Sequence, residues 1–344
     1  MRAAVFHEHG PRDVLQIAAD LPMPTPGPGE VRLKMGAAAL NRLDLFVREG
    51  WKGLDLALPH ITCADGAGTV DLLGPGVTQF APGDRVGINP TITDPDCLLM
   101  EGTEDACLGS PILGEHVPGV AAEYVVLPAR NLIKLPDHIS VAAAAAVGLV
   151  FVTAWHSLIV RGGLQPGESV LVVGASGGVN TASVQIAKAI GARVYVVGSD
   201  AAKCAQVEPL GADVVINRED DPNWSKAIYS ATRKRGVDVV VDNVGAATLF
   251  DSIRAAAKGG RILIVGNTSG PKVELDLRYL FTKHLTIIGS SMGTTQDYRR
   301  VMGLVFDGVL NPVIGARLPL EEIREGHRLL EAGEVFGKIV LEIA

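Results

Sequence analysis

Short, uniformly apolar segments that alternate with helical patterns between residues 165 and 290 constrain the fold more than any other feature of the sequence. We expect strands at 170–173, 193–197, 214–216, 237–241, 262–265 and 285–288, with helices at 181–190 and 201–210. Strands without polar alternation are typical of a parallel sheet that helices cover on both faces. The sequence therefore predicts an α/β fold built on a doubly wound parallel sheet.

The first 130 residues show a different pattern. Apolar runs at 31–35, 67–72, 85–88 and 122–127 are separated by turns rich in proline and glycine, which indicates a β-rich region. After residue 294 helical patterns return, and the chain ends in the strand-like segment 338–341. Because 344 residues exceed one ordinary core, we expect two domains.

Charge and cysteine content argue against several classes of protein. The formal net charge is −7 and no long basic run offsets it, so we expect neither nucleic acid nor a membrane as a partner. The four cysteines, Cys63, Cys97, Cys107 and Cys204, are too few for a disulfide scaffold in a chain of this length. The first residues lack the apolar core of a signal peptide, which favours a cytoplasmic location.

Residues 141–160 carry no formal charge and are long enough for a membrane span. However, the segment is rich in alanine, contains polar side chains and has no second candidate elsewhere in the chain. A pair of buried helices is the better interpretation.

A glycine-rich loop follows the strand at 170–173 and leads into a helix. Glycines let the backbone turn sharply and approach a pyrophosphate, and the helix presents unpaired N–H groups to it. The usual three-glycine pattern is imperfect, because Ala175 stands at its first glycine position and Asn180 at its third. The order of strand, loop, helix and second strand still predicts a dinucleotide site. Its expected contacts from this loop are Gly174, Ser176, Gly177, Gly178, Val179 and Asn180.

The end of the second strand bears on the choice between NAD and NADP. Gly198 stands where an acid would bind the ribose hydroxyls of NAD, and Ser199 and Lys203 are placed to meet a 2′-phosphate. This favours NADP(H). Asp200 lies two residues too late by this count, but a different strand length would restore NAD, and Lys203 is equally compatible with a solvated helix face.

Polar residues also follow the later strands. Carboxyl ends of parallel strands are where doubly wound sheets bind ligands. We therefore expect further cofactor contacts from Asn243, Val244, Asn267 and Ser290.

Several motifs in this order resemble the medium-chain dehydrogenase/reductase superfamily over nearly the whole chain. They are Pro82-Gly83-Asp84-Arg85-Val86, Ala122-Glu123-Tyr124-Val125, the glycine-rich loop, Leu210-Gly211-Ala212-Asp213, 238–242 and 337–341. The resemblance implies a GroES-like catalytic domain (1–150, completed by 294–344) around a Rossmann domain (151–293), with the active cleft between them. It also implies Lys338 as a cofactor contact, and a homodimer or homotetramer, commonly a dimer joined through the edge strand near 285–290.

Zinc-dependent alcohol dehydrogenases of this family hold their catalytic metal with a Cys, a His and a further Cys or acid. Here the first position is Asn41, the second falls in Cys63-Ala64-Asp65, and the third falls near Leu149. The side chains at these positions are the amide of Asn41, the methyl group of Ala64 and the isobutyl group of Leu149. Such a set cannot hold a tetrahedral zinc ion. The pattern is similar to the zinc-free quinone oxidoreductase branch, so we expect no catalytic metal.

The family's structural zinc lobe is only partly retained. Of its four cysteines, Cys97 and Cys107 remain, with Asp94 as an oxygen donor. A metal-free lobe is the main interpretation, and a structural zinc held by these residues stays open.

The absence of a Lewis acid limits the carbonyl substrates that such a site can reduce. Reducing a plain ketone develops a full alkoxide, whereas a quinone or enone spreads that charge, so that neutral hydrogen-bond donors suffice. We expect NADPH-dependent reduction of a quinone or an α,β-unsaturated carbonyl. The alternatives are an alcohol dehydrogenase with an unusual metal site and a dinucleotide-binding protein of low turnover.

The expected catalytic residues come from two segments of the chain. Asn41 would donate to the substrate oxygen, with Arg42 beside it and Asp44 orienting Asn41 or binding the nicotinamide ribose. Asn41 and Asp44 are also residues that cap helices. By the resemblance, Thr153 lies where relatives contact the nicotinamide, although a buried helix hydroxyl bonded to its own backbone is the alternative.

Overall fold

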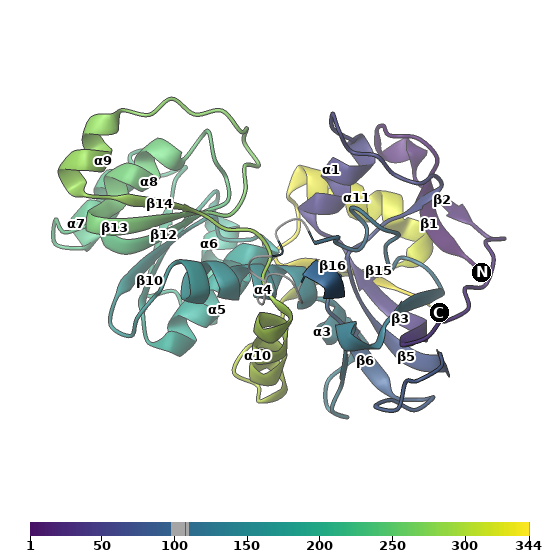
Figure 1. Cartoon of the computed structure of the whole chain (residues 1–344). Helices are drawn as coiled ribbons and strands as arrows, with labels where there is room; N and C mark the ends of the chain where they lie inside the picture. Colours follow the sequence, from purple (N-terminus) through teal and green to yellow (C-terminus); the bar gives the residue numbers. More distant parts are fainter. Residues whose placement is uncertain (98–106, 108–109, 344) are drawn as a thin grey trace. The chain divides into compact units, whose positions relative to one another are not determined.

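The computed structural model describes residues 1–97, 107 and 110–343, and the chain divides into two compact units (Figure 1). The first unit comprises 1–150 and 294–344, and the second comprises 151–293. We call them the catalytic unit and the dinucleotide unit. Each is described by itself.

The dinucleotide unit contains one parallel sheet of six strands in the order β11-β10-β9-β12-β13-β14. The chain passes from β9 outward to β11, then crosses to β12 on the other side of β9, which makes β9 and β12 the switch point. This confirms the predicted doubly wound sheet. The strands are β9 (Ser169–Val173), β10 (Arg193–Gly198), β11 (Val214–Asn217), β12 (Val237–Asp242), β13 (Ala256–Ile264) and β14 (Thr286–Gly289).

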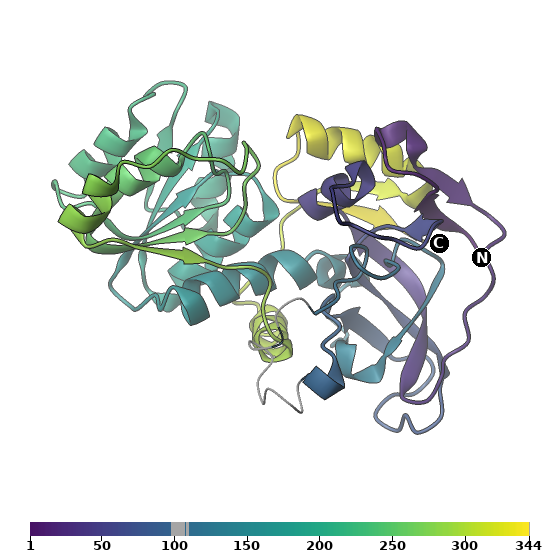
Figure 2. The ribbon, with the colours of Figure 1, turned by 45° about the horizontal axis from the view of Figure 1, so that its top comes forward.

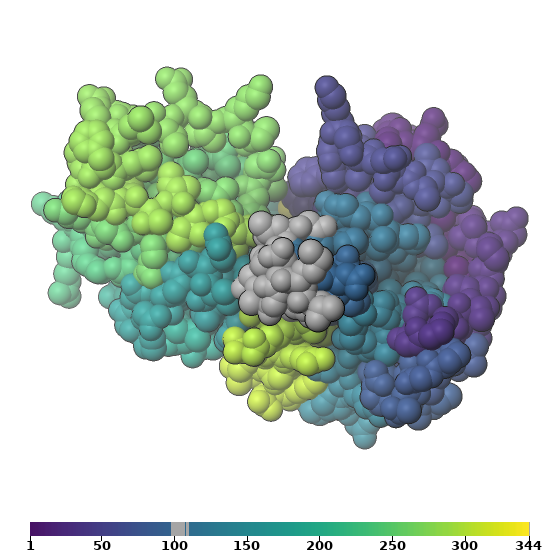
Figure 3. Space-filling view, viewed as in Figure 1, coloured from purple at the N-terminus to yellow at the C-terminus, as the bar shows by residue number. Residues whose placement is uncertain are grey.

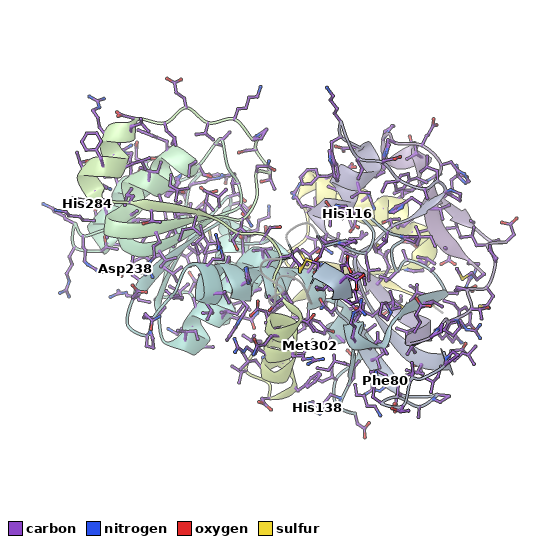
Figure 4. The ribbon with its side chains drawn as sticks, viewed as in Figure 1. Phe80, His116, His138, Asp238, His284 and Met302 are labelled. Atoms are coloured by element: carbon purple, nitrogen blue, oxygen red, sulfur yellow. A yellow bond between two sulfur atoms is a disulfide. The ribbon has the colours of Figure 1, made fainter. Side chains whose placement is uncertain are left out.

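Helices cover both faces of this sheet. Figure 1 shows α5 on the face opposite α8 and α9. β9 is buried along its whole length, as its unbroken apolar sequence predicts. Asp238 of β12, labelled in Figure 4, accepts hydrogen bonds from the backbone and hydroxyl of Ser169 and so fixes the start of β9. The helices are α5 (Gly178–Ile190), α6 (Ala201–Val207), α7 (Trp224–Ala231), α8 (Leu249–Ala255) and α9 (Leu277–Lys283).

The catalytic unit is built on a seven-stranded sheet with the path β15-β16-β3-β5-β6-β8, in which β7 pairs with β3. The other named strands that the structure describes in this unit form a three-stranded sheet, β2-β1-β4 (Figure 2). The strands are β1 (Ala3–Phe6), β2 (Gln16–Ala18), β3 (Glu30–Ala39), β4 (His60–Ile61), β5 (Asp65–Leu73), β6 (Arg85–Ile88), β7 (Tyr124–Pro128), β8 (Leu132–Lys134), β15 (Ile314–Pro319) and β16 (Lys338–Glu342).

Segments from both ends of the chain form this unit together. β16 pairs antiparallel with β3, so the last strand of the chain lies beside one of the first. Helix α1 (Arg42–Glu49) follows β3, and α10 (Thr295–Phe306) and α11 (Ile323–Ala332) precede β16. Met302 of α10, labelled in Figure 4, is buried and faces Gly87 of β6.

The uncharged segment 141–160 is largely buried and forms helices, as expected. It contains α3 (Val141–Ala145), α4 (Gly148–Trp155) and the start of a π-helical turn, His156–Arg161. Within the described residues, no helix has the length and apolarity that crossing a membrane requires.

The two cysteines of the residual lobe are joined to each other. Cys97 and Cys107 form a disulfide with Cα atoms 5.9 Å apart. Neither thiolate is then available to a zinc ion, and an Asp94 oxygen accepts from the backbone N–H of Asp96. Cys63 and Cys204 are free and buried.

Candidate active site

The loop between β9 and α5 has the geometry of an anion-binding turn. Gly174 has a φ of 108°, and a Cβ atom there would collide with the side-chain amide of Asn180. Helix α5 begins at Gly178 with Gly177 as its N-cap, and no side chain caps it. The uncapped N–H groups and the positive end of the helix dipole suit a pyrophosphate. The residues of this loop therefore fit a dinucleotide.

Asn180 and Asn243, both predicted as cofactor contacts, lie together in the structure. The Asn243 side-chain N–H donates to Asn180 Oδ1 over 2.8 Å. The loop that carries Asn243 and Val244 is shaped by the fully buried Asp242, whose Oδ1 accepts from the N–H groups of Val244 and Gly245. Asp242 also accepts from two hydroxyl groups at the start of α8.

Our sequence analysis missed this role of Asp242. The available signal was a carboxylate that ends an otherwise apolar strand, where an unpaired charge is too costly to bury.

At the end of β10 the structure places an acid beside the predicted 2′-phosphate ligands. Gly198 is required, because a side chain there would collide with Cys204 Sγ. Asp200 caps α6 by accepting from the Lys203 N–H over 2.9 Å. It also accepts from the Ser199 hydroxyl over 2.8 Å and lies 3.0 Å from Lys203 Nζ.

These contacts alter the charge that a cofactor would meet. The Lys203 backbone N–H is the largest cause holding the pKa of Asp200 down at about 2, so the carboxylate is ionised at neutral pH. Ser199 and Lys203 are thus engaged with Asp200 rather than free.

The remaining predicted residues of this unit have different surroundings. Ser290 follows β14, and its buried hydroxyl has no hydrogen-bond partner among the described residues. Asn267 is exposed in the loop after β13. Thr153 in α4 is 5% exposed and its hydroxyl donates to Met292 Sδ over 3.7 Å rather than to its own helix backbone. Ser176 and Val179 are half-buried in the glycine-rich loop.

In the catalytic unit, three adjacent strands bring Asn41, Asp65 and Lys338 together. Asn41 follows the central strand β3, Asp65 is the first residue of β5, and Lys338 is the first residue of β16. The register pairs Ala39 with Asp65 on one side and with Val340 on the other. The three side chains therefore meet at one end of the sheet.

A hydrogen-bonded network joins these side chains. Lys338 Nζ donates to Asn41 Oδ1 over 2.5 Å and to Asp65 Oδ2 over 3.0 Å. Asn41 Nδ2 donates to the same Asp65 oxygen over 2.9 Å, and the Leu149 backbone N–H donates to Asp65 Oδ1 over 2.6 Å. The three side chains are 5%, 0% and 4% exposed for Asn41, Asp65 and Lys338.

The network corrects our expectation of a site with neutral donors only. A buried ammonium group, Lys338, stands beside Asn41, and both polar ends of the Asn41 amide are already engaged. Lys338 was expected as a cofactor contact, and its partnership with Asp65 was not anticipated. The two residues are 273 positions apart, so no local pattern in the sequence signals their contact.

Asp44 and Cys63 pack beneath this network. Asp44 accepts from the Asn41 N–H over 2.6 Å and from the Cys63 N–H over 3.2 Å, so it does orient the Asn41 backbone at the start of α1. Burial raises the pKa of Asp44 to about 7, against the opposing effects of the Asn41 N–H and the charge of Lys338. Burial likewise raises the pKa of the Cys63 thiol, which disfavours the reactive thiolate.

The side chain of Arg42 does not take part in this network. It occupies the first turn of α1 and is exposed, and its side chain makes no hydrogen bond or ion pair with the described residues.

The residues at the family's zinc position do not fit a zinc ion. Asn41 Oδ1 and Asp65 Oδ2 both accept from the Lys338 ammonium group, whose positive charge repels a metal cation. The third position, Leu149, contributes only a backbone N–H, which is a donor and not a ligand. Among the described residues, no three His, Cys, Asp or Glu side chains are grouped so as to hold a metal.

Comparisons with known proteins agree with the fold. The family model for the alcohol dehydrogenase GroES-like domain matches residues 27–137, and the model for zinc-binding dehydrogenases matches residues 178–307. The quinone oxidoreductase of Lama guanicoe is 30% identical over 348 residues, which covers 99% of this chain and 97% of the relative. The acryloyl-coenzyme A reductase of Metallosphaera sedula is 32% identical over 320 residues, covering 92% and 93%.

A crystal structure described as an NAD-dependent alcohol dehydrogenase is 45% identical, with a TM-score of 0.96 and complete coverage of both chains. Fold and site together define an oxidoreductase that uses a nicotinamide dinucleotide. The chain belongs to the medium-chain dehydrogenase/reductase superfamily.

Proposed function

We propose that this chain reduces a quinone or an α,β-unsaturated carbonyl with NADPH, and that it does so without a catalytic zinc ion. The observation that carries the proposal is the donor set at the family's zinc position. There the chain has a buried network of Lys338, Asp65 and Asn41 in place of a set of metal ligands.

The chemistry of the substrate follows from this donor set. A saturated ketone needs strong stabilisation of a localised alkoxide, which zinc supplies in metal-dependent enzymes. In an enone or a quinone, conjugation spreads the developing charge, so that preorganised N–H donors are sufficient. When bound, the reduced nicotinamide supplies the hydride.

Relatives with this chemistry support the proposal. One relative is named a quinone oxidoreductase, and another is named an acryloyl-coenzyme A reductase, whose name denotes reduction of a conjugated C=C bond. The similar structure described as an alcohol dehydrogenase favours the alternative, a dehydrogenase of alcohols with a different metal arrangement.

We assign a distinct role to each predicted catalytic residue. Asn41 orients the Lys338 ammonium group through Oδ1, and Asp44 holds the Asn41 backbone. Thr153 borders the nicotinamide. Arg42, exposed at the start of α1, is available to contact the substrate.

In the dinucleotide unit we assign the pyrophosphate to the loop from Gly174 to Asn180. Asn243, Val244, Asn267 and Ser290 contact the nicotinamide half of the cofactor. Support comes from the Ser290 hydroxyl, which has no hydrogen-bond partner in the described part of the chain, and from the position of all four residues after the carboxyl ends of strands.

NADPH is proposed over NADH because Gly198 leaves the acid position empty and no side chain fits there without moving Cys204. In the complex with NADPH, the 2′-phosphate would replace Asp200 as the hydrogen-bond acceptor of Ser199 and Lys203. The negative charge of Asp200 and the name of the NAD-dependent relative support NADH as the alternative.

A substrate panel tests the proposal. Oxidation of NADPH and of NADH is followed by absorbance with quinones, enones, saturated ketones and, in reverse, alcohols. We expect turnover with quinones or enones, a preference for NADPH, and no effect of EDTA. Turnover confined to alcohols and lost with EDTA would overturn the proposal, and cofactor binding without any turnover would favour a non-catalytic role.

We further propose that the protein is a homodimer joined through the edge strand β14. Ile287 of β14 and the nearby Leu277 and Phe281 of α9 are 37%, 65% and 66% exposed, which is unusual for large apolar side chains. Figure 3 shows the green segment that carries α9 at the surface of this unit. Ile287→Lys should yield a monomer in light scattering, whereas Val309→Lys, at an exposed position of the catalytic unit, should not.

A further inference from the structure

The geometry points to the Lys338 ammonium group as a fixed cation that binds the carbonyl oxygen of the substrate and stabilises the negative charge that develops there. Lysine would then supply the electrostatic stabilisation that a metal supplies in zinc-dependent relatives. This inference rests on the proposed reduction of a conjugated carbonyl and names the residue that makes it possible.

The donor count of Lys338 leaves room for a substrate oxygen. An ammonium group has three N–H donors. In the described chain, two of them are used, by Asn41 Oδ1 at 2.5 Å and by Asp65 Oδ2 at 3.0 Å. Lys338 is only 4% exposed, and a buried charged donor without an acceptor is costly. The third N–H is therefore the donor best suited to a ligand oxygen.

The backbone of Lys338 is fixed on the side that faces β15. Its N–H donates to the Val313 carbonyl over 2.8 Å, and it pairs with Ile314 of β15. Gly337 precedes it with a φ of 91°, and a Cβ there would collide with the Val313 carbonyl. A cation held in place before reaction stabilises charge without reorganisation, which is the largest single effect in many enzymes.

Asp65 and Asn41 position the ammonium group rather than contact the substrate. The Asp65 carboxylate compensates the positive charge of Lys338. The Leu149 backbone N–H holds this carboxylate in place through a hydrogen bond of 2.6 Å. A side chain at Gly148 would collide with Asp65 Oδ1, so glycine is required for this approach. The Asn41 amide is engaged at both ends and is a weaker candidate for the substrate oxygen than Lys338.

The reactants of the proposed step are an enone and the reduced nicotinamide. The β-carbon gains a hydride, that is, one hydrogen with two electrons, and the C=C π pair moves to give an enolate. The enolate oxygen carries the negative charge and accepts a hydrogen bond from Lys338. A proton from water then converts the enolate to the saturated carbonyl, and the nicotinamide is left oxidised.

Replacing the cation by an isosteric apolar group tests the role. Lys338→Met should lower kcat about 10²–10³-fold, the usual cost of losing one preorganised donor, and should leave the Kd for NADPH within about threefold. Lys188→Met is the matched control, because Lys188 is a half-exposed lysine of α5 paired with Asp213. It should leave both quantities unchanged.

A binding probe gives a readout that does not depend on turnover. The whole enzyme, saturated with NADP⁺, is titrated with 4-nitrophenol, whose phenolate absorbs visible light. A fixed cation lowers the pKa of the bound phenol, so the wild type should bind the phenolate at least about tenfold more tightly than the phenol. Lys338→Met should lose this preference, and Lys338→Arg, which keeps the charge, should retain most of it.

Three results would overturn the inference: an unchanged kcat in Lys338→Met, an unchanged phenolate preference in that variant, or equal loss of the preference with Met and Arg. If Lys338→Met does not fold, Lys338→Gln against Lys338→Arg makes the same comparison of neutral with charged donor. Absence of turnover by the wild type with every quinone and enone refutes the proposed function instead, so the two failures are distinguishable.

Discussion

Replacing Asp65 by asparagine should destabilise the catalytic unit far more than a surface change of the same chemistry. The substitution leaves the Lys338 charge buried without its counter-ion, since the two side chains are 4% and 0% exposed. Removing one partner of a buried ion pair costs about 3–5 kcal/mol. For a domain of this size, each kcal/mol shifts Tm by about 2–4 °C, so we expect a loss of about 6–20 °C.

The assay is differential scanning calorimetry at neutral pH with Glu342→Gln as the matched control. Glu342 lies on the same strand, β16, and pairs with Arg317 over 3.1 Å, but both side chains are more than half exposed. Such a pair contributes about 0–1 kcal/mol. The double variant Asp65→Asn/Lys338→Met should recover part of the loss, because no charge is then left uncompensated.

The reasoning fails if Asp65→Asn costs no more than Glu342→Gln. It also fails if the double variant is less stable than Asp65→Asn alone.

Three further predictions concern the cofactor and pH. Asp200→Asn keeps the helix cap but removes a negative charge beside Ser199 and Lys203. The variant should therefore bind NADPH about tenfold more tightly in a fluorescence titration, with no gain in affinity for NADH. Weaker binding of NADPH would contradict this. Gly174→Ala strains a φ of 108° and meets the Asn180 amide, so it should weaken NADPH at least about tenfold; unchanged affinity would contradict the loop assignment. In the folded state the pKa of Asp44 is raised to about 7. At pH values between the lower pKa of the unfolded chain and about 7, Asp44 is therefore protonated in the folded state and ionised in the unfolded state. The contribution of Asp44 to the free energy of unfolding then falls as the pH rises through this range. The stability of the wild type relative to Asp44→Asn, measured by urea unfolding, should therefore decrease from pH 5 to pH 8, and a constant difference would contradict the raised pKa.

Much of the fold follows from local sequence patterns. The apolar runs Val170–Val173 and Val239–Val241 predict β9 and β12, because a strand that is buried on both faces has few polar side chains. The first turn of α5 and the loop before it follow from glycines that permit a positive φ. The start of β13 at Ala256 was missed, since Gly259 and Gly260 interrupt its pattern.

The candidate site was predicted only in part, for a physical reason. Asn41 and Asp44 lie in one segment, and their relation to the start of α1 is readable from capping chemistry. The contact between Lys338 and Asp65 depends instead on how three strands pair in the sheet, which no spacing in the sequence encodes. For that reason the sequence predicts a neutral site where the structure has a buried cation.

The role of Asp200 shows the same limit on a smaller scale. Its position relative to the end of β10 depends on where the strand stops, and boundaries are the weakest part of a prediction from sequence. Once β10 is seen to end at Gly198, Asp200 emerges as the cap of α6 and as a partner of both Ser199 and Lys203.

Metal content measured together with turnover is the most direct test of the central claim that the chain reduces conjugated carbonyls without zinc. The protein is dialysed against EDTA, its zinc is quantified by mass spectrometry, and NADPH oxidation is followed with an enone or a quinone. The account predicts full activity at a zinc content far below one ion per chain. Activity that is lost on chelation and restored by added zinc would contradict it.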